Sequence, residues 1–525
     1  MQRRKRPSKA PLALALVACL LGLLAARVAQ AGDPELRWHS IETPHFRISY
    51  HDPLGQVAQR LAILAERAHG KLVPVLDHSP RFRTEVLLTD DTDFSNGSAT
   101  ALPFPTVRLY LTAPDSRSEL NDFDDWLTAL FTHEYTHILH LDTINGLPKW
   151  LNYLAGFGIN TLYAPNQVQP RWFIEGLAVF EETERTSGGR LRSALFDMYL
   201  RAHSLEGKFL RLDQVSNQTR LFPRGNVPYL YGSAFLRYIA QKKGAEVLTK
   251  VSHRYGGCYS PDCWLPWGMS RALRRFTGTT YGALYDGFRK ELSERYTAQK
   301  GAILSTPLGQ VQPQPASGWK TDVDRPLFEP DGQHLLWLES DPYRRPALMR
   351  HDLSTGRSTV ELLIDGASGL SLSRDGRLAL MARLGYFRAN FSFKDLVLYD
   401  RAEQRLIALS SGLRVDHPDL SPDGSLACFE VNALGTRRLG VMALPRPAER
   451  SGAEHTESAA AALALSADVD PRAVAVPEVF RARAAAPVRF PLPQDDFSQV
   501  YTPVFSPDGQ HIAFSYWQRG GYRDI

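Results

Sequence analysis

The C-terminal part of the chain contains four copies of one short segment, and this repetition constrains the fold more than any other feature of the sequence. In each copy an Asp-Gly pair separates two stretches of alternating apolar residues, which predicts two strands joined by a tight turn. The pairs are separated by 44, 48 and 85 residues. The first two spacings are typical of β-propeller blades, which repeat every ~40–50 residues. The glycines of the four pairs are Gly332, Gly376, Gly424 and Gly509.

The long third spacing indicates an insertion at about 445–495, which is rich in Ala, Pro and Arg and is expected to be disordered or loosely structured. The Ser-Pro-Asp-Gly copies at 421–424 and 506–509 resemble TolB-like propellers, and this resemblance covers about residues 320–525. Closed propellers have about 4–8 blades, whereas about three and a half are expected here. We therefore expect a fragment or premature end of a longer protein, or closure by a partner chain.

Residues 1–31 predict an export signal, with a basic start, an apolar run and a small-x-small cleavage site at Ala29–Ala31. They contribute +6 to a formal net charge of +5, so the remainder carries −1 and nothing favours a nucleic-acid partner. The alternative is a lipoprotein cleavage box with a lipid anchor at Cys19, but the apolar run continues past that residue. No segment predicts a membrane span, and we expect an exported protein, periplasmic or extracellular.

Three cysteines remain after removal of the signal. Cys258 and Cys263 lie close together in the sequence and predict a disulfide in an oxidising compartment, with a metal site as the less favoured alternative. Cys428 is expected to be a single buried thiol in a strand.

Residues 133–137 read His-Glu-Tyr-Thr-His, the H-E-x-x-H pattern. Flanking apolar residues recur at helical spacing, with Asn121 and Asp122 as suitable N-caps, so a buried helix is predicted. Residues four apart share one helix face, so His133 and His137 can bind one metal ion while Glu134 acts as general base. The pattern alone also occurs in amphipathic helices with incidental histidines.

A second motif supplies a third ligand. Residues 170–182 predict a helix that begins at Pro170 and carries Glu175 in its first turns. An H-E-x-x-H helix followed by W-x-x-E-G-x-A, here residues 172–178, resembles the gluzincin metallopeptidases and, among them, the peptidase MA-like group. The resemblance implies that His133, His137 and Glu175 bind one Zn²⁺ and that Glu134 is the base. Taken alone, Glu175 is also explained as an acid that is favourable near a helix N-terminus.

Neighbouring polar residues have other interpretations. His140 is displaced around the helix from His137 and is not expected to bind the metal. Glu181 and Glu182 are expected to form a solvated helix end, with a hydrogen bond to a ligand histidine as the alternative.

The segment 226–238 resembles the helix that follows the ligand helix in MA-like relatives. The resemblance implies a tyrosine that stabilises the oxyanion, for which Tyr231 is the first choice and Tyr229 the second. The alternative for both is packing of an aromatic helix face against the core.

The predicted fold class is multidomain: an α+β zincin-like domain with a helical second lobe, followed by an incomplete all-β propeller. The α+β lobe is expected to have an edge strand that binds a peptide by strand addition. The stretch 146–169 is expected to contribute to the substrate cleft. The predicted parts are a signal peptide at 1–31, the zincin-like domain at 32–303, a linker at 304–319 and propeller blades at 320–525.

These features predict an exported zinc metallopeptidase that hydrolyses protein or peptide substrates, with a propeller that docks substrate or a protein partner. The alternative is a non-catalytic envelope scaffold in which a degenerate metal fold accompanies a protein-binding propeller. A third interpretation is a metal-dependent hydrolase of something other than peptides.

Overall fold

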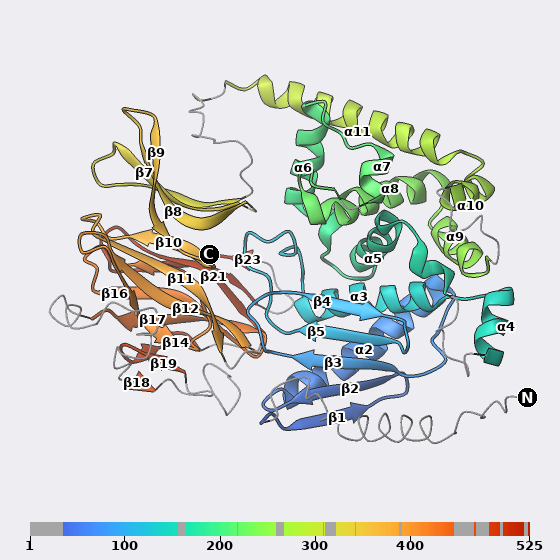
Figure 1. Cartoon of the computed structure of the whole chain (residues 1–525), viewed down its shortest axis with the longest axis horizontal. Coiled ribbons are helices and arrows are strands. Elements are labelled where there is room, and N and C mark those ends of the chain that lie inside the picture. Colours follow the sequence, from blue (N-terminus) through green and yellow to red (C-terminus); the bar gives the residue numbers. More distant parts are fainter. Residues whose placement is uncertain are drawn as a thin grey trace, which may run out of the picture.

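The computed structural model comprises an N-terminal α+β region with a helical lobe, followed by a region of β-sheets (Figure 1). The predicted signal peptide lies outside the described residues, as do most of the predicted linker and insertion. The structure describes residues 35–155, 164–217, 219–258, 267–307, 309, 322–341, 343–387, 391–445, 467–468, 482–493, 497–518 and 523–525.

The N-terminal sheet has five strands in the order β1-β2-β3-β5-β4. The pairs β2–β3 and β3–β5 are parallel, and the outer pairs are antiparallel. The short edge strand β4 was not predicted, because its Gly-Ser-Ala-Thr sequence lacks the apolar alternation of a strand. The strands are β1 (Trp38–Glu42), β2 (Phe46–His51), β3 (Thr84–Thr89), β4 (Gly97–Thr100) and β5 (Thr106–Tyr110).

Two helices, α2 (Gly55–Leu76) and α3 (Trp126–Asp142), pack against this sheet. Successive residues on a helix are rotated by about 100°, so positions two apart point roughly in opposite directions. Phe131 and Tyr135 of α3 accordingly contact Phe46 of the sheet at ring distances of 5.4 and 5.0 Å. Positions 133 and 137, each two residues further along α3, therefore face away from Phe46.

The helix α3 begins later than the sequence predicted. Its N-cap is Asp125, whose carboxylate accepts a hydrogen bond from Thr128 N at 2.8 Å. The prediction of Asn121 or Asp122 as N-cap is wrong, since both residues belong to the loop that precedes the helix. This loop, 111–125, connects β5 to α3 and contacts both the metal-binding region and the propeller region, as described below.

The helical lobe covers α3 from the side opposite the sheet (Figure 1). Its helices α5 and α8 touch backbone to backbone: a Cβ on Gly176 would lie 2.5 Å from the carbonyl carbon of Gly232. The glycine of the E-G-x-A motif is therefore required by helix packing. The helices are α4 (Gly146–Ala155), α5 (Arg171–Arg185), α6 (Ala194–Leu205), α7 (Leu212–Ser216), α8 (Val227–Lys243), α9 (Glu246–Gly256), α10 (Trp267–Thr277) and α11 (Tyr281–Leu304).

The C-terminal region contains two four-stranded antiparallel sheets, each of the size of a propeller blade. A third set, β15-β16-β17, gains β20 as its fourth strand and is joined by one parallel pair to β21-β22-β23. The first two sheets consist of β6 (Asp322–Phe328), β7 (His334–Asp341), β8 (Arg344–Asp352), β9 (Arg357–Leu363), β10 (Ala367–Leu372), β11 (Leu378–Phe387), β12 (Phe391–Asp400) and β13 (Arg405–Ala408). The later strands are β14 (Ser410–Ser411), β15 (Val415–Leu420), β16 (Leu426–Ala433), β17 (Thr436–Ala443), β18 (Ala467–Asp468), β19 (Arg483–Ala484), β20 (Val488–Arg489), β21 (Gln499–Phe505), β22 (Ile512–Trp517) and β23 (Arg523–Asp524).

The four Asp-Gly glycines all have positive φ, between 64° and 74°, as the predicted tight turns require. The first strands of the four sets, β6, β10, β15 and β21, follow one another side by side. Each of them carries an irregularity of register at the same place in the repeat. The region is thus a series of blade-like sheets, as the repeats predicted.

A buried arginine joins the two regions. Arg414, which precedes β15, donates to Asp90 at 2.6 and 2.8 Å and to Asp93 at 2.8 Å. Both aspartates lie in the polar loop after β3, whose backbone also pairs with Ser392 of β12. The structure therefore fixes the orientation of the propeller region relative to the sheet through a desolvated ion-pair cluster.

Cysteine chemistry agrees with the sequence where it is described. Cys258 is disulfide-bonded, and Cys428 is a free, buried thiol in β16. Cys263 lies outside the described residues. Among the helices that the structure describes, none is both long and apolar enough to cross a membrane.

Candidate metal centre

The three side chains that the sequence predicts as metal ligands lie close together between α3 and α5. One ligand atom from each of His133, His137 and Glu175 lies within 4.8 Å of the other two. The two histidines project from the face of α3 opposite Phe131 and Tyr135, and Glu175 comes from the first turns of α5. His137 Nε2 and Glu175 Oε2 are 3.2 Å apart. The structure thus contains a buried His-His-Glu group that could hold a metal ion.

Glu134 lines the same cavity as the three ligand residues. It is 5% exposed, and its carboxylate makes no hydrogen bond or ion pair with any described residue. Burial raises its pKa to about 7, with opposing contributions from His137 and Glu175. The edge strand β4 approaches it closely, since a Cβ on Gly97 would lie 2.7 Å from Glu134 Oε1. The carboxylate lines the cavity, where a ligand could complete its surroundings.

A cavity of about 420 Å³ contains this group. Its walls come from β4, α3, the start of α5, the loop 111–125 and the beginning of α8. None of the described residues of the stretch 146–169 lines this cavity, so the prediction that this stretch contributes to the cleft is not met by the part that the structure describes.

His133 is held by a buried ion pair that the sequence did not reveal. Its Nδ1 lies 3.0 Å from Glu182 Oε2 and 2.6 Å from Arg190 Nη2, and Arg190 also donates to Glu182 at 2.6 Å. Glu182 can accept from Nδ1 only when that nitrogen is protonated, whereas Arg190 can donate to it only when it is not. The two contacts therefore belong to alternative tautomers. The one that Glu182 stabilises leaves Nε2 free to bind a metal.

The electrostatic environment keeps His133 neutral. Burial and the nearby Arg190 lower its pKa to about 4, so the ring carries no charge at neutral pH, as a metal ligand requires. For Glu175, burial would raise the pKa, but the hydrogen bond and charge of His137 outweigh it and lower the pKa. Burial would lower the pKa of His137, but the hydrogen bond and charge of Glu175 raise it, so a cation that binds here would displace a proton from His137.

One separation between donor atoms is compatible with a bound metal ion. Donor atoms bonded to a tetrahedral zinc ion at roughly 2.0–2.2 Å are about 3.3–3.6 Å apart, and His137 and Glu175 are separated by 3.2 Å. His137 Nε2 points toward Glu175, while His137 Nδ1 is buried without a hydrogen-bond partner among the described residues. Two imidazoles and one carboxylate are also a known donor set of catalytic zinc sites.

The two candidate tyrosines occupy different environments. Tyr229 lines the cavity, stacks near His133 at a ring distance of 6.2 Å, and has Arg190 over its ring. Tyr231, the first choice from the sequence, is fully buried elsewhere: its hydroxyl bonds His203 Nδ1 at 2.6 Å and accepts from Leu210 N. Because Tyr231 does not line the cavity, its side chain has the packing role that was the alternative.

Of the remaining expectations for polar residues near the site, one is confirmed and one is wrong. His140 bonds Gln169 at 2.9 Å and stays outside the ligand group, as expected. The expectation of a solvated helix end at Glu181 and Glu182 is wrong, since they are only 2% and 5% exposed. The sequence did not predict Arg190, because it lies at no fixed spacing from the H-E-x-x-H motif. Arg190 reaches His133 from the short turn after α5, and only its contact with the buried Glu182 identifies it as part of the site.

No family model matches the chain. A curated protein of Treponema pallidum (strain Nichols), described as uncharacterized, is 27% identical over 238 residues. The aligned part is 43% of this chain and 21% of that protein, so the match spans about a fifth of the relative's length. The resemblance to gluzincins therefore rests on the motif residues and on the His-His-Glu group.

The C-terminal region is similar to solved propeller proteins. The structure of TolB from Acinetobacter baumannii is 17% identical over 38% of this chain and 39% of that chain, with a TM-score of 0.27. The structure of a TolB from Agrobacterium tumefaciens is 15% identical over 39% and 57%, with a TM-score of 0.26. Hydrazine synthase of Kuenenia stuttgartiensis is 13% identical over 38% and 57%, with a TM-score of 0.27. Scores this low carry no argument about function.

Proposed function

We propose that this chain is an exported, zinc-dependent metallopeptidase that hydrolyses peptide bonds in polypeptide substrates. The observation that carries the proposal is the combination of the buried His-His-Glu group with Glu134, an unpaired carboxylate in the same cavity. A site that only stabilised the fold would have no need for a buried carboxylate without a partner. The export signal in residues 1–31 supports a periplasmic or extracellular location.

The protein would supply proton transfer and orientation. His133, His137 and Glu175 would hold a zinc ion, which would supply Lewis-acid polarisation of the carbonyl and activation of water. Glu134 accepts a proton from the attacking water and later donates it to the leaving amine, which requires a carboxyl with a pKa near neutrality. Glu182 holds His133 in the tautomer that binds the ion.

Tyr229 is the residue that we assign to oxyanion stabilisation. Burial and the charge of Glu175 raise its pKa to about 12, so its hydroxyl stays protonated and can donate a hydrogen bond. Its place at the N-terminal end of α8 is set by the backbone contact between Gly176 and Gly232.

The substrate is best accommodated as an extended strand. Among the described strands, β4 is the last of its sheet and pairs with β5 alone, and it lines the cavity beside Glu134. A polypeptide that added to this edge would present its backbone to Glu134, a mode of recognition that does not depend on side-chain identity.

The decisive test compares the wild-type chain with Glu134→Gln for bound zinc and for cleavage of denatured casein. We expect one zinc ion per chain in both proteins and a rate of cleavage about 10²–10⁴-fold lower for the variant. Glu206→Gln, at an exposed carboxylate outside the cavity, is the matched control and should cleave normally. A wild-type protein that binds no zinc contradicts the proposal. If both proteins bind zinc and neither cleaves, the scaffold interpretation is favoured.

A further inference from the structure

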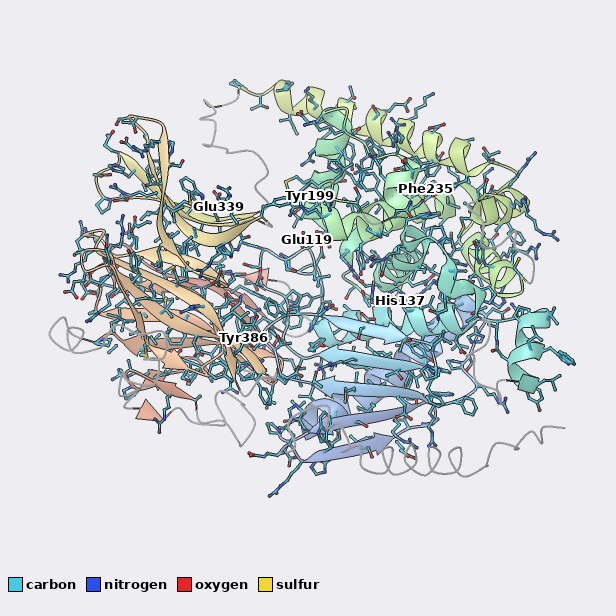
Figure 2. All side chains as sticks on the ribbon, in the orientation of Figure 1. Glu119, His137, Tyr199, Phe235, Glu339 and Tyr386 are labelled. Atoms are coloured by element: carbon cyan, nitrogen blue, oxygen red, sulfur yellow. The ribbon has the colours of Figure 1, made fainter. Side chains whose placement is uncertain are left out.

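The metal-site cavity is one of two that meet at the domain junction. A second cavity, of about 600 Å³, lies between the helical lobe and the first blade, β6–β9. Two residues of the loop 111–125, Ser118 and Glu119, line both cavities. In Figure 2, Glu119 lies between His137 of the metal-binding helix, Tyr199 of the helical lobe and Glu339 of the first blade. A polypeptide that leaves the metal site in this direction must pass Glu119.

Glu119 is held in place from both sides. Two residues before it, Arg117 forms a bidentate ion pair with Asp324 of β6, in which Nη2 and Oδ2 are 3.1 Å apart. Asn226, next to α8, donates to Glu119 Oε1 at 2.9 Å. A carboxylate accepts about four hydrogen bonds, so this half-buried group keeps acceptor capacity toward the cavities.

The charges around the second cavity favour a cation. Besides Glu119, its lining contains three carboxylates, Asp115, Asp324 and Glu339, against two guanidinium groups, Arg117 and Arg224. Arg117 pairs with Asp324, and Arg344 pairs with Glu339 at 3.2 Å. These pairs leave Glu119 and Asp115 against Arg224, so the lining keeps a small excess of negative charge. An anionic side chain brought beside Glu119 would be repelled, whereas an ammonium or guanidinium group would be attracted.

We propose that Glu119 is a specificity-determining residue that binds a lysine or arginine side chain of the substrate polypeptide. The proposal rests on the proposed function for the identity of the ligand as a polypeptide. It predicts that the cleaved bonds lie at a fixed number of residues from a basic residue, while β4 holds the backbone without regard to sequence.

The first test is a cleavage profile. A mixture of denatured proteins is digested with the zinc-loaded chain, and the new termini are identified by mass spectrometry. We expect lysine and arginine to be enriched about three- to tenfold over aspartate and glutamate at one position near the scissile bond. The enrichment should disappear in Glu119→Gln and reverse in Glu119→Lys. Glu206→Lys, which makes the same charge change on the exposed surface outside both cavities, should keep the wild-type profile.

The second test does not require catalysis. Zinc-loaded Glu134→Gln protein is titrated with two fluorescent extended peptides that differ in one residue, lysine or glutamate, and binding is followed by anisotropy. The lysine peptide should bind about three- to tenfold more tightly, and Glu119→Gln in the same background should remove the difference. Equal binding of both peptides, or a preference that survives Glu119→Gln, overturns the proposal. If the wild-type chain cleaves nothing but this binding preference is present, the proposed catalysis fails while the subsite stands.

Discussion

The metal-binding region and the propeller region bury polar side chains in different ways. In the propeller region two half-buried carboxylates pair with the backbone of the next blade: Asp324 accepts from Gly369 N at 2.9 Å, and Asp419 accepts from Phe505 N at 2.8 Å. These contacts lie beside the register irregularities of the first strands. The backbone there has positive φ in each repeat, at Arg325, Gly369, His417 and Thr502.

In the metal-binding region the buried polar groups occur once and converge on one place. His133, His137, Glu175 and Glu182 are brought together from two helices, and Glu134 beside them has no partner among the described residues. Repeated, paired polar groups are explained by the need to join one blade to the next. Glu134 occurs once and is unpaired among the described residues, so it has no such explanation and is the better candidate for chemistry.

The largest expected effect tests whether the two regions form one unit. Arg414→Ala leaves Asp90 and Asp93 buried without their cation, so we expect the free energy of unfolding to fall by roughly 3–5 kcal/mol. Arg345→Ala removes an exposed pair with Asp365 and should cost ~0–1 kcal/mol. Denaturant unfolding measures both. Equal losses would show that the buried cluster does not stabilise the contact between the regions.

A smaller effect tests whether the single-copy polar groups act on the metal. Glu182→Gln keeps the size of the side chain but removes the charge that favours the metal-binding tautomer of His133, so zinc affinity should fall about 10–100-fold. Glu181→Gln is the matched control, because Glu181 is a buried neighbour on the same helix that pairs with Arg185 instead. Competition with a coloured chelator measures both affinities. Similar zinc affinities for the two variants would show that Glu182 does not contribute to metal binding.

The sequence predicted those parts of the molecule that follow local rules. The 3.6-residue period placed both histidines on one face of α3, and the Asp-Gly turns located the blades, because each depends on residues close together in the chain. The start of α3 was misplaced because several acidic residues precede it, and only the hydrogen bond from Thr128 N identifies Asp125 as the cap.

The remaining features depend on contacts between distant segments. Arg190 reaches His133 across 57 residues of sequence, and Arg414 reaches Asp90 across 324. No local period reports such contacts. The sequence did not show that Tyr229 and not Tyr231 lines the cavity for a similar reason, since this depends on how α8 packs against α5 at Gly232.

The smallest expected effects come from one glycine-to-alanine substitution in each region. We expect the free energy of unfolding to change in opposite directions in the two regions. Gly509, in the turn of the last repeat, has φ of +72°, and a Cβ there would meet its nearest atom, Pro422 Cδ, only at 3.4 Å. Glycine is therefore needed at position 509 for its backbone conformation and not because a side chain would clash. Gly509→Ala should lower the free energy of unfolding by roughly 1–2 kcal/mol.

Gly70 provides the opposite case, because it is an exposed residue inside the helix α2 and a Cβ there would have no atom within 4 Å. Gly70→Ala should therefore raise the free energy of unfolding by roughly 0.5–1 kcal/mol. Thermal unfolding of the two variants, with zinc content unchanged in both, measures the contrast. A Gly509→Ala protein as stable as the wild type would mean that the last repeat contributes little to the cooperative unit that holds the metal-binding region.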